Sequence, residues 1–122
     1  MGRPRVDAEW VALARQRTDS TTEHFGVSMR RRAGAPEGPC RLGMSVPKRL
    51  LPLAVDRNAL KRVAREAWRL ADWPVELRPE RAMIKLRRRD DGWRELPRGA
   101  LKRLWRTELD RLIGRARARM TP

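Results

Sequence analysis

The segment over residues 55–69 carries the most regular pattern of charged side chains in the chain. Wound as an α-helix at about 100° per residue, it places five cations and one amide on a single arc. These side chains are Arg57, Asn58, Lys61, Arg62, Arg65 and Arg69. Because guanidinium groups bind phosphate through a bidentate fork and lysine binds it as a point charge, this arc is suited to phosphate binding. Glu66 is the single carboxylate near the arc and can shield only part of its charge.

Asn58 and the loop before the helix allow two interpretations. An amide both donates and accepts hydrogen bonds, so Asn58 can contact a 2′-hydroxyl or a base edge of RNA, or it can hold the loop that precedes the helix. Lys48 and Arg49 lie in that loop and extend the cationic surface. The alternative for the whole arc is an ordinary solvated helix face, which the excess of positive charge disfavours.

The charge of the whole chain indicates the same kind of partner. The 122 residues include 30 Lys and Arg against 15 Asp and Glu, so the formal net charge is +15 and the isoelectric point is about 11.7. Such a charge speeds association with phosphate polymers and releases their counterions on binding. Since 40% of the residues are hydrophobic and five are Trp, we still expect one folded domain over residues 1–122, with a core of about 5–117. Nucleic acid is the expected partner, and no protein partner is evident.

Several other classes of protein are disfavoured. No segment has the roughly 18 consecutive apolar residues of a membrane span, and the first ten residues lack the apolar stretch of a signal peptide. We therefore expect a cytoplasmic protein that binds no membrane. Cys40 and His24 are the single residues of their types, which excludes a zinc site built from Cys and His.

The sequence predicts no catalytic residue and no metal ligand in the protein. We interpret Cys40 as a core residue, although a Cys40–His24 pair across neighbouring strands is geometrically possible. A protein-only nuclease would need clustered acidic metal ligands. Asp90 and Asp91 are adjacent in a predicted turn, and no further acidic group is evidently placed to join them.

The first half of the chain predicts one helix and two strands. Residues 6–17 predict a helix with Asp7 as its N-cap. Residues 24–30 and 40–46 alternate between apolar and polar side chains, as is typical of strands with one buried face. The Gly and Pro residues of 33–39 predict a loop between them. We expect the two strands to form an antiparallel hairpin.

The second half predicts two helices around a third strand. Asp56 is the expected N-cap of the basic helix, which should end near residue 72 because Pro74 follows. Residues 82–86 predict a strand, and residues 97–117 predict a helix with an apolar stripe. Four tryptophans are interpreted mainly as core residues, namely Trp68, Trp73, Trp93 and Trp105. Trp68 borders the basic arc and could also contact RNA. Together the elements predict an α+β domain with three helices and a small, mostly antiparallel sheet.

Residues 41–69 also carry a signature that is similar to a known family. They contain a Gly-x-x-Val strand end, a basic pair, and then Ala-Val-x-Arg-Asn-x-x-Lys-Arg-x-x-Arg-Glu. This order resembles the signature region of the bacterial ribonuclease P protein subunit. The matching residues are Arg41, Gly43, Val46, Lys48, Arg49, Ala54, Val55, Arg57, Asn58, Lys61, Arg62, Arg65, Glu66 and Arg69. Because the order of the other elements is also similar to the family, the resemblance covers nearly the whole chain.

The resemblance implies a fold, a function and partners. The fold would have three layers around a four-stranded sheet, with a left-handed βαβ crossover that departs from the usual hand. The protein would be the accessory subunit of an endoribonuclease whose catalyst is RNA, assisting removal of the 5′ leader from precursor tRNA and broadening substrate specificity. The basic helix would face the catalytic RNA subunit, and a cleft between that helix and the sheet would hold the leader. Mg²⁺ at the scissile phosphate would be bound mainly by the RNA.

The resemblance carries over two sets of contacts. Those expected with RNA are Lys48, Arg49, Arg57, Asn58, Lys61, Arg62, Arg65 and Arg69. Those expected with the leader are Trp10, Phe25 and Ser28. The leader set departs from the family, which often has two aromatic residues one turn apart in the first helix for stacking on bases. Here Ala14 takes the second place, Ser28 or Met29 replaces a later aromatic, and Trp10 has the alternative of a core position.

A structural RNA-binding protein, such as a ribosomal component, is the alternative function. Composition alone does not separate the two. The ordered spacing of Arg57, Asn58, Lys61 and the residues that follow favours the ribonuclease P subunit, because a generic basic helix has no reason to hold that order. Ala59 is a departure here, since the third position of the Arg-Asn-x triplet is commonly basic in the family.

Overall fold

The structure of the chain, a computed structural model, describes residues 8–31 and 40–120. The expected N-cap Asp7 and the expected loop over 33–39 lie outside these residues. The elements in chain order are α1 (Ala8–Arg15), β1 (Ser20–Thr21), β2 (Phe25–Arg30), β3 (Arg41–Ser45), α2 (Ala54–Arg69), the 3-10 helix η1 (Val75–Leu77), β4 (Arg81–Leu86), the 3-10 helix η2 (Asp91–Glu95) and α3 (Arg98–Met120).

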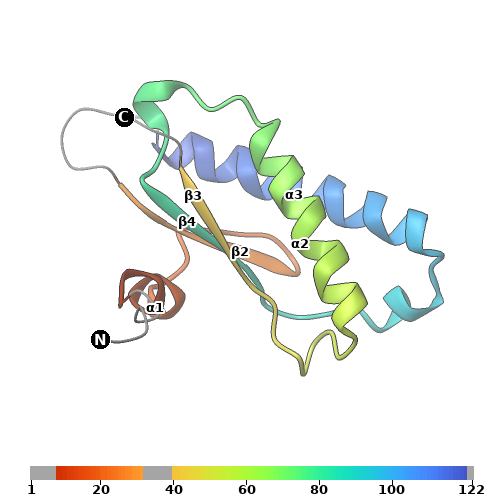
Figure 1. The fold of residues 1–122 in the computed structure, drawn as a ribbon. Helices are drawn as coiled ribbons and strands as arrows, with labels where there is room; N and C mark the ends of the chain where they lie inside the picture. Colours follow the sequence, from red (N-terminus) through yellow and green to blue (C-terminus); the bar gives the residue numbers. More distant parts are fainter. Residues whose placement is uncertain (1–7, 32–39, 121–122) are drawn as a thin grey trace.

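The strands form one mixed sheet in the order β1-β2-β4-β3 (Figure 1). β2 pairs antiparallel with β4, and β3 pairs parallel with β4. The predicted hairpin of β2 with β3 is therefore wrong, because β4 lies between them. Five of the six β4 residues are buried, which suits a central strand covered on both faces. The unit β3–α2–β4 is a βαβ crossover between neighbouring parallel strands.

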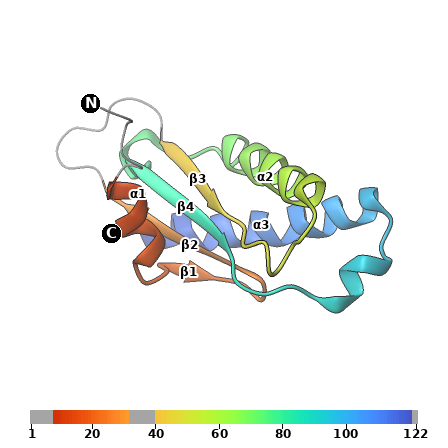
Figure 2. The same cartoon turned by 60° about the horizontal axis from the view of Figure 1, so that its bottom comes forward.

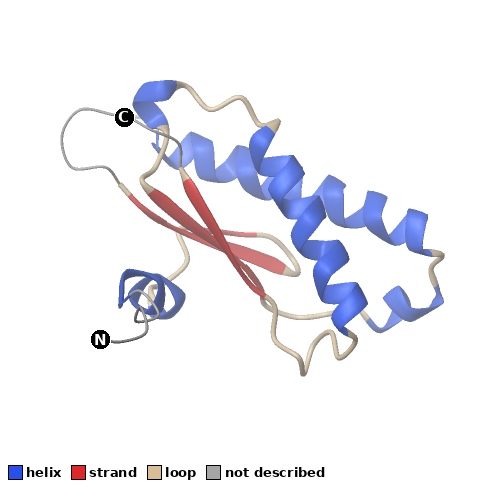
Figure 3. Ribbon diagram, in the orientation of Figure 1, coloured by secondary structure: helices blue, strands red, loops and turns tan. Residues whose placement is uncertain are grey.

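Helices cover both faces of the sheet and give three layers (Figures 2 and 3). α2 and α3 lie on one face, where they cover the apolar side chains of β2 and β4. α1 lies on the other face, where the Ser28 hydroxyl donates to the backbone carbonyl of Gln16 just after the helix. The alternation of the strands thus directs Phe25 toward α2 and α3, and Ser28 toward α1.

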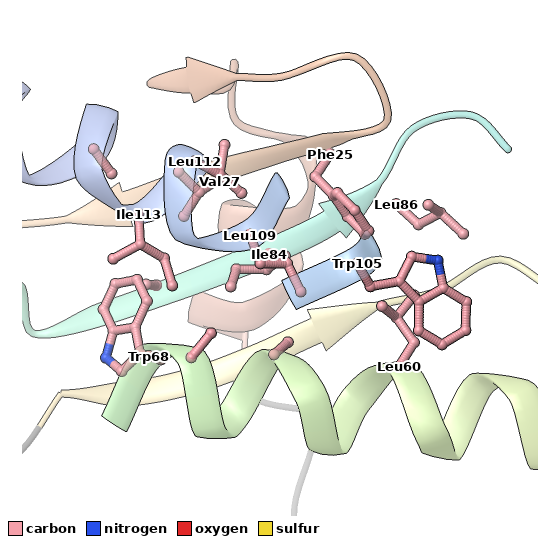
Figure 4. Packing of buried hydrophobic residues seen from close by; sticks show 14 of the residues in the cluster. Phe25, Val27, Leu60, Trp68, Ile84, Leu86, Trp105, Leu109, Leu112 and Ile113 are labelled. Atoms are coloured by element: carbon pink, nitrogen blue, oxygen red, sulfur yellow. The ribbon is translucent and has the colours of Figure 1, made fainter. Parts of the chain in front are cut away.

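The core lies between the sheet and the two long helices (Figure 4). Phe25 and Ile84 of the sheet face Leu60 of α2 and Leu109 of α3, and all four side chains are fully buried. The tryptophans expected in the core, Trp68, Trp73, Trp93 and Trp105, are buried as predicted. Edge-to-face packing of Trp93 on Trp105, with 5.8 Å between ring centroids, extends this core to the start of α3.

The two ends of α2 differ from the sequence prediction. Asp56 is not the N-cap, because the helix begins after Leu53 and no side chain caps it. α2 ends at Arg69 rather than near residue 72, and Asp72 then adopts a left-handed conformation with φ of 55°. Leu70, the residue that follows the helix, is exposed.

Candidate nucleic-acid interface

One long face of α2 carries the predicted arc. Leu60, Ala64 and Ala67 point into the core and fix the rotation of the helix. The opposite side presents exposed polar side chains and the half-buried Lys61. We call this surface the outer face of α2, and it consists of Asn58, Lys61, Arg62, Arg65 and Arg69. The structure therefore brings five of the six residues of the arc together on one surface.

The cations of the outer face lack counter-charges within the described part of the chain. No ion pair or side-chain hydrogen bond there involves Lys61, Arg62, Arg65 or Arg69. Glu66, which was expected to shield them, instead accepts from Arg106 of α3 at 3.1 Å. The positive potential of this face is therefore left for an external anion to balance.

Arg57 has a different surrounding from the other arc residues. Its side chain is half-buried, and one guanidinium nitrogen donates to the carbonyl oxygens of Leu51 at 2.8 Å and Pro52 at 2.7 Å. Arg57 thus holds the loop before α2, the role that the sequence left open for Asn58. Asn58 itself is exposed and forms no side-chain hydrogen bond with a described residue.

The loop held by Arg57 carries the basic pair. Leu51 is buried in the core and anchors the loop, whereas Lys48 and Arg49 are exposed. Because the loop runs directly into α2, the pair adds two cations at the N-terminal end of the same helix (Figure 1). Arg57 therefore fixes the position of the loop that carries this basic pair.

Trp10 lies on the opposite face of the sheet. Its ring is half-buried and covers Gly43 of β3, where an added Cβ would come within 2.7 Å of a ring carbon. Glycine is therefore required beneath the ring. The guanidinium carbon of Arg81 lies 5.1 Å from the ring centroid, in cation–π contact. Glu9 forms ion pairs with Arg81 at 3.1 Å and with Arg30.

The other two expected leader contacts are corrected by their burial. Phe25 and Ser28 each have 0% of their surface exposed. Phe25 belongs to the core beneath α3, and Ser28 is covered by α1, so neither side chain can reach RNA in this conformation. Both faces of β2 are covered, which the alternating pattern of a single strand does not reveal.

A buried carboxylate joins α3 to the start of β2. One oxygen of Glu108 accepts from the Thr22 hydroxyl and from the His24 backbone amide, and the other oxygen contacts His24 Nδ1, all at 2.7 Å. Burial alone would raise the pKa of Glu108, but these hydrogen bonds outweigh it and lower the pKa below its ordinary value of 4.5. The ionised carboxylate is therefore the form that the fold stabilises.

The chemistry of this cluster fits an internal network better than a metal ion. Glu23, His24 and Glu108 bring ligand atoms within 4.8 Å of one another. However, Glu108 already accepts three hydrogen bonds, and Glu23 accepts from the Arg111 guanidinium at 2.8 Å. A cation would compete with that guanidinium, and Mg²⁺ prefers oxygen ligands in an octahedral arrangement. We assign the cluster to stability.

The structure does not bring Cys40 and His24 together. His24 precedes β2 beside the end of β4 at Leu86, whereas Cys40 precedes β3 beside the start of β4 at Arg81. The two side chains lie near opposite ends of that strand, so the Cys–His pair considered from the sequence is wrong. The Cys40 thiol instead donates to the carbonyl of Arg41 at 3.6 Å.

Comparison with known proteins identifies the family. The model of the ribonuclease P family matches residues 5–117. The chain belongs to the ribonuclease P protein family. The ribonuclease P protein component of Paraburkholderia xenovorans is 32% identical over 122 residues, which cover 93% of this chain and 78% of that protein. The ribonuclease P protein component of Halorhodospira halophila is 42% identical over 52 residues, which cover 42% of this chain and 39% of that protein.

The fold agrees with a solved structure of the same family. The ribonuclease P protein of Staphylococcus aureus superposes with a TM-score of 0.63 over 91% of each chain, at 18% sequence identity. The three helices and the four-stranded mixed sheet are therefore the ribonuclease P protein fold. None of the helices in residues 8–31 and 40–120 is long and apolar enough to span a bilayer.

Sequence reasoning missed what α3 contributes to the interface. Arg98 of α3 forms an ion pair with Asp56 of α2, and Arg106 of α3 forms one with Glu66 of α2. Lys102 lies between the two arginines along the same side of α3. These contacts join residues about 40 positions apart in the sequence, so local spacing does not predict them. The only available signal was the recurrence of basic residues every four positions at the start of α3.

Proposed function

We propose that the outer face of α2 binds the catalytic RNA subunit of ribonuclease P. The observation that carries the proposal is that four cations on one face of a helix form no ion pair or side-chain hydrogen bond with a described residue. Lys61, Arg62 and Arg65 lie one turn apart or less and can follow a phosphate backbone. Arg69 lies on the same face at the last turn of the helix, and Lys48, Arg49 and Arg57 continue the surface at its start.

The protein's share of the reaction is then binding and positioning. The RNA subunit carries out hydrolysis, and Mg²⁺ at the scissile phosphate is held mainly by RNA. The described part of the chain supports this division, because its one cluster of possible metal ligands is occupied by internal hydrogen bonds. Positioning alone can accelerate a reaction greatly, since it replaces the entropy cost of bringing reactants together.

The second proposed contact is between Trp10 and the 5′ leader of precursor tRNA. Trp10 supports it by being half-exposed on the face of the sheet opposite α2, with Arg81 against its ring. An unpaired base can stack on the accessible part of the indole, as bases do on aromatic side chains in single-strand binders. Phe25 and Ser28 are not included, because both are buried.

Reconstitution tests who performs the chemistry. Purified protein should not cleave precursor tRNA at any Mg²⁺ concentration, and addition of the cognate RNA subunit should give cleavage at the mature 5′ end. Site-specific cleavage by RNA-free protein would contradict the proposal.

Copurification tests the partner. Protein isolated from its own cells should retain one RNA of several hundred nucleotides. Recovery of ribosomal RNA in its place would favour the alternative of a ribosomal-type RNA-binding protein.

A further inference from the structure

A groove runs between α2 and the first half of α3. It has a volume of about 570 Å³ and is open to solvent along its length. Ala59 and Val63 of α2 form an apolar floor, and both are packed against the core. Asn58 and Arg62 stand on one side of the floor, and Lys102 of α3 stands on the other. Figure 1 shows α2 crossing α3, with both helices beginning at the same end of the molecule.

The charges around the groove leave two cations without carboxylates. Glu66 is the acidic residue among the side chains that line the groove, and both Glu66 and Asp56 of α2 are paired with arginines of α3. Arg98 binds Asp56 at 3.1 Å, and Arg106 binds Glu66 at 3.1 Å. No described residue forms an ion pair or side-chain hydrogen bond with Arg62 or with Lys102. The middle of the groove is therefore its most positive part.

The shape and chemistry of the groove match a stretch of RNA backbone. A phosphate between Arg62 and Lys102 would satisfy both cations, because arginine offers a fork and lysine a point charge. The apolar floor can take the face of a ribose. The exposed amide of Asn58 can donate to or accept from a 2′-hydroxyl, because Arg57 rather than Asn58 holds the preceding loop. Ala59 keeps the floor low enough for that approach.

We propose that the α2–α3 groove binds an RNA backbone phosphate between Arg62 and Lys102, so that the RNA interface continues from α2 onto α3. This inference rests on the proposed function and adds to it a second helix and a defined site. The bridging phosphate belongs to the RNA subunit or to precursor tRNA. The RNA would then contact both helices at once, so binding would depend on how α2 and α3 are placed relative to each other. A single basic helix would provide only one line of contacts.

The test is a double-mutant cycle in the full-length protein with Arg62→Ala and Lys102→Ala. Each single variant should weaken RNA binding roughly ten-fold, the lower end of what a hydrogen bond to a charged group contributes. Each should also reduce the slope of log affinity against log salt by roughly one unit. Since both residues would contact one phosphate, the double variant should lose less than the product of the two single losses. Lys102→Arg, which keeps the positive charge, should retain most of the affinity that Lys102→Ala loses.

Arg119→Ala is the matched control, because Arg119 is an exposed cation at the far end of the same helix. The groove proposal would be overturned if Lys102→Ala matched Arg119→Ala in both affinity and slope while Arg62→Ala lost affinity. That result would leave the proposed function intact. Failure of the unmodified protein to bind the RNA subunit would overturn both. Two titrations assign the phosphate to one RNA: the first uses the isolated RNA subunit, and the second adds precursor tRNA to the assembled holoenzyme. The proposal is supported if, in either titration, the double variant loses less affinity than the product of the two single losses.

Discussion

The two sides of the molecule use their cations differently. On the side covered by α1, Glu9 pairs with Arg30 and Arg81, and the Lys85 ammonium donates to the carbonyl of Gln16 at 2.8 Å. On the outer face of α2, the cations form no ion pair or side-chain hydrogen bond with described residues. Both sides are basic in sequence, yet the cations on one side connect secondary-structure elements, whereas those on the other side pair with none of the residues that the structure describes.

The difference separates charge that stabilises the fold from charge that awaits a partner. A cation between two elements contributes to stability through its hydrogen bonds, so its removal should lower the free energy of unfolding. A cation on the outer face of α2 is repelled by its neighbours, so its removal should leave stability unchanged or raise it slightly. Stability and RNA affinity should therefore respond to different sets of substitutions.

Phe25→Ala should have the largest effect and should act on stability alone. Phe25 is fully buried between the sheet and α3, so we expect a loss of about 3–5 kcal/mol in the free energy of unfolding. Urea titration followed by circular dichroism measures it. Any RNA affinity that remains at a temperature where the variant is folded should equal that of the unmodified protein. A selective loss for leader-bearing RNA in the folded variant would reinstate Phe25 as a leader contact.

Trp10→Ala asks whether the α1 side also binds RNA. Base stacking on an aromatic ring contributes about 1–3 kcal/mol, so precursor tRNA with its leader should bind roughly 5- to 150-fold more weakly. Mature tRNA, which lacks a leader, should bind almost as before. If both RNAs lost affinity in parallel and the melting temperature fell, Trp10 would be a core residue, and the α1 side would serve only the fold.

Glu108→Gln tests the buried charge that joins α3 to β2. The substitution removes an ionised acceptor from Thr22 and His24 and should cost about 1–3 kcal/mol of stability. RNA affinity and its salt dependence should not change, because Glu108 is buried away from the outer face of α2. A changed salt dependence in the folded variant would mean that this buried charge is coupled to the outer face of α2.

The same carboxylate predicts a pH dependence of stability. Its pKa is lower in the folded chain than its ordinary value of 4.5, so the ionised form binds the fold more strongly than the neutral form does. This contribution is complete above pH 4.5 and is lost as the pH falls through the folded-state pKa. Urea titrations at a series of pH values should show the fall below pH 4.5, and the fall should be smaller in Glu108→Gln.

The elements that could be predicted from the sequence are those with a short-range periodic pattern. The basic helix was predicted from residue 55 to near residue 72 and is found at Ala54–Arg69, so its start was predicted to within one residue and its end was placed too late. The strand predicted at 82–86 is found at Arg81–Leu86. Both have strong local patterns. Strand order has no such signal, since it depends on which edges pair over long distances in sequence, and the central position of β4 was missed for that reason. The two-residue β1 is too short to show alternation.

The site was predictable in its surface but not in its connections. Helical spacing alone placed Arg62, Arg65 and Arg69 on one face. Spacing did not reveal that Glu66 turns to Arg106, that Arg57 holds the loop, or that α1 covers Ser28, because each of these contacts crosses between elements. The family resemblance likewise assigned roles to residues by their type and position in the sequence. It did not indicate whether each side chain is buried, which decides whether it can reach RNA.

The most direct test of the central claim is the salt dependence of RNA-subunit binding for Arg62→Ala/Arg65→Ala. The matched control is Arg30→Ala, which removes a cation from the α1 side. We predict that the double variant lowers the slope of log affinity against log salt by roughly two units and keeps the unfolding free energy of the unmodified protein. The control should lose stability and keep the slope. An unchanged slope in the double variant would show that the outer face of α2 is merely solvated and does not bind the RNA.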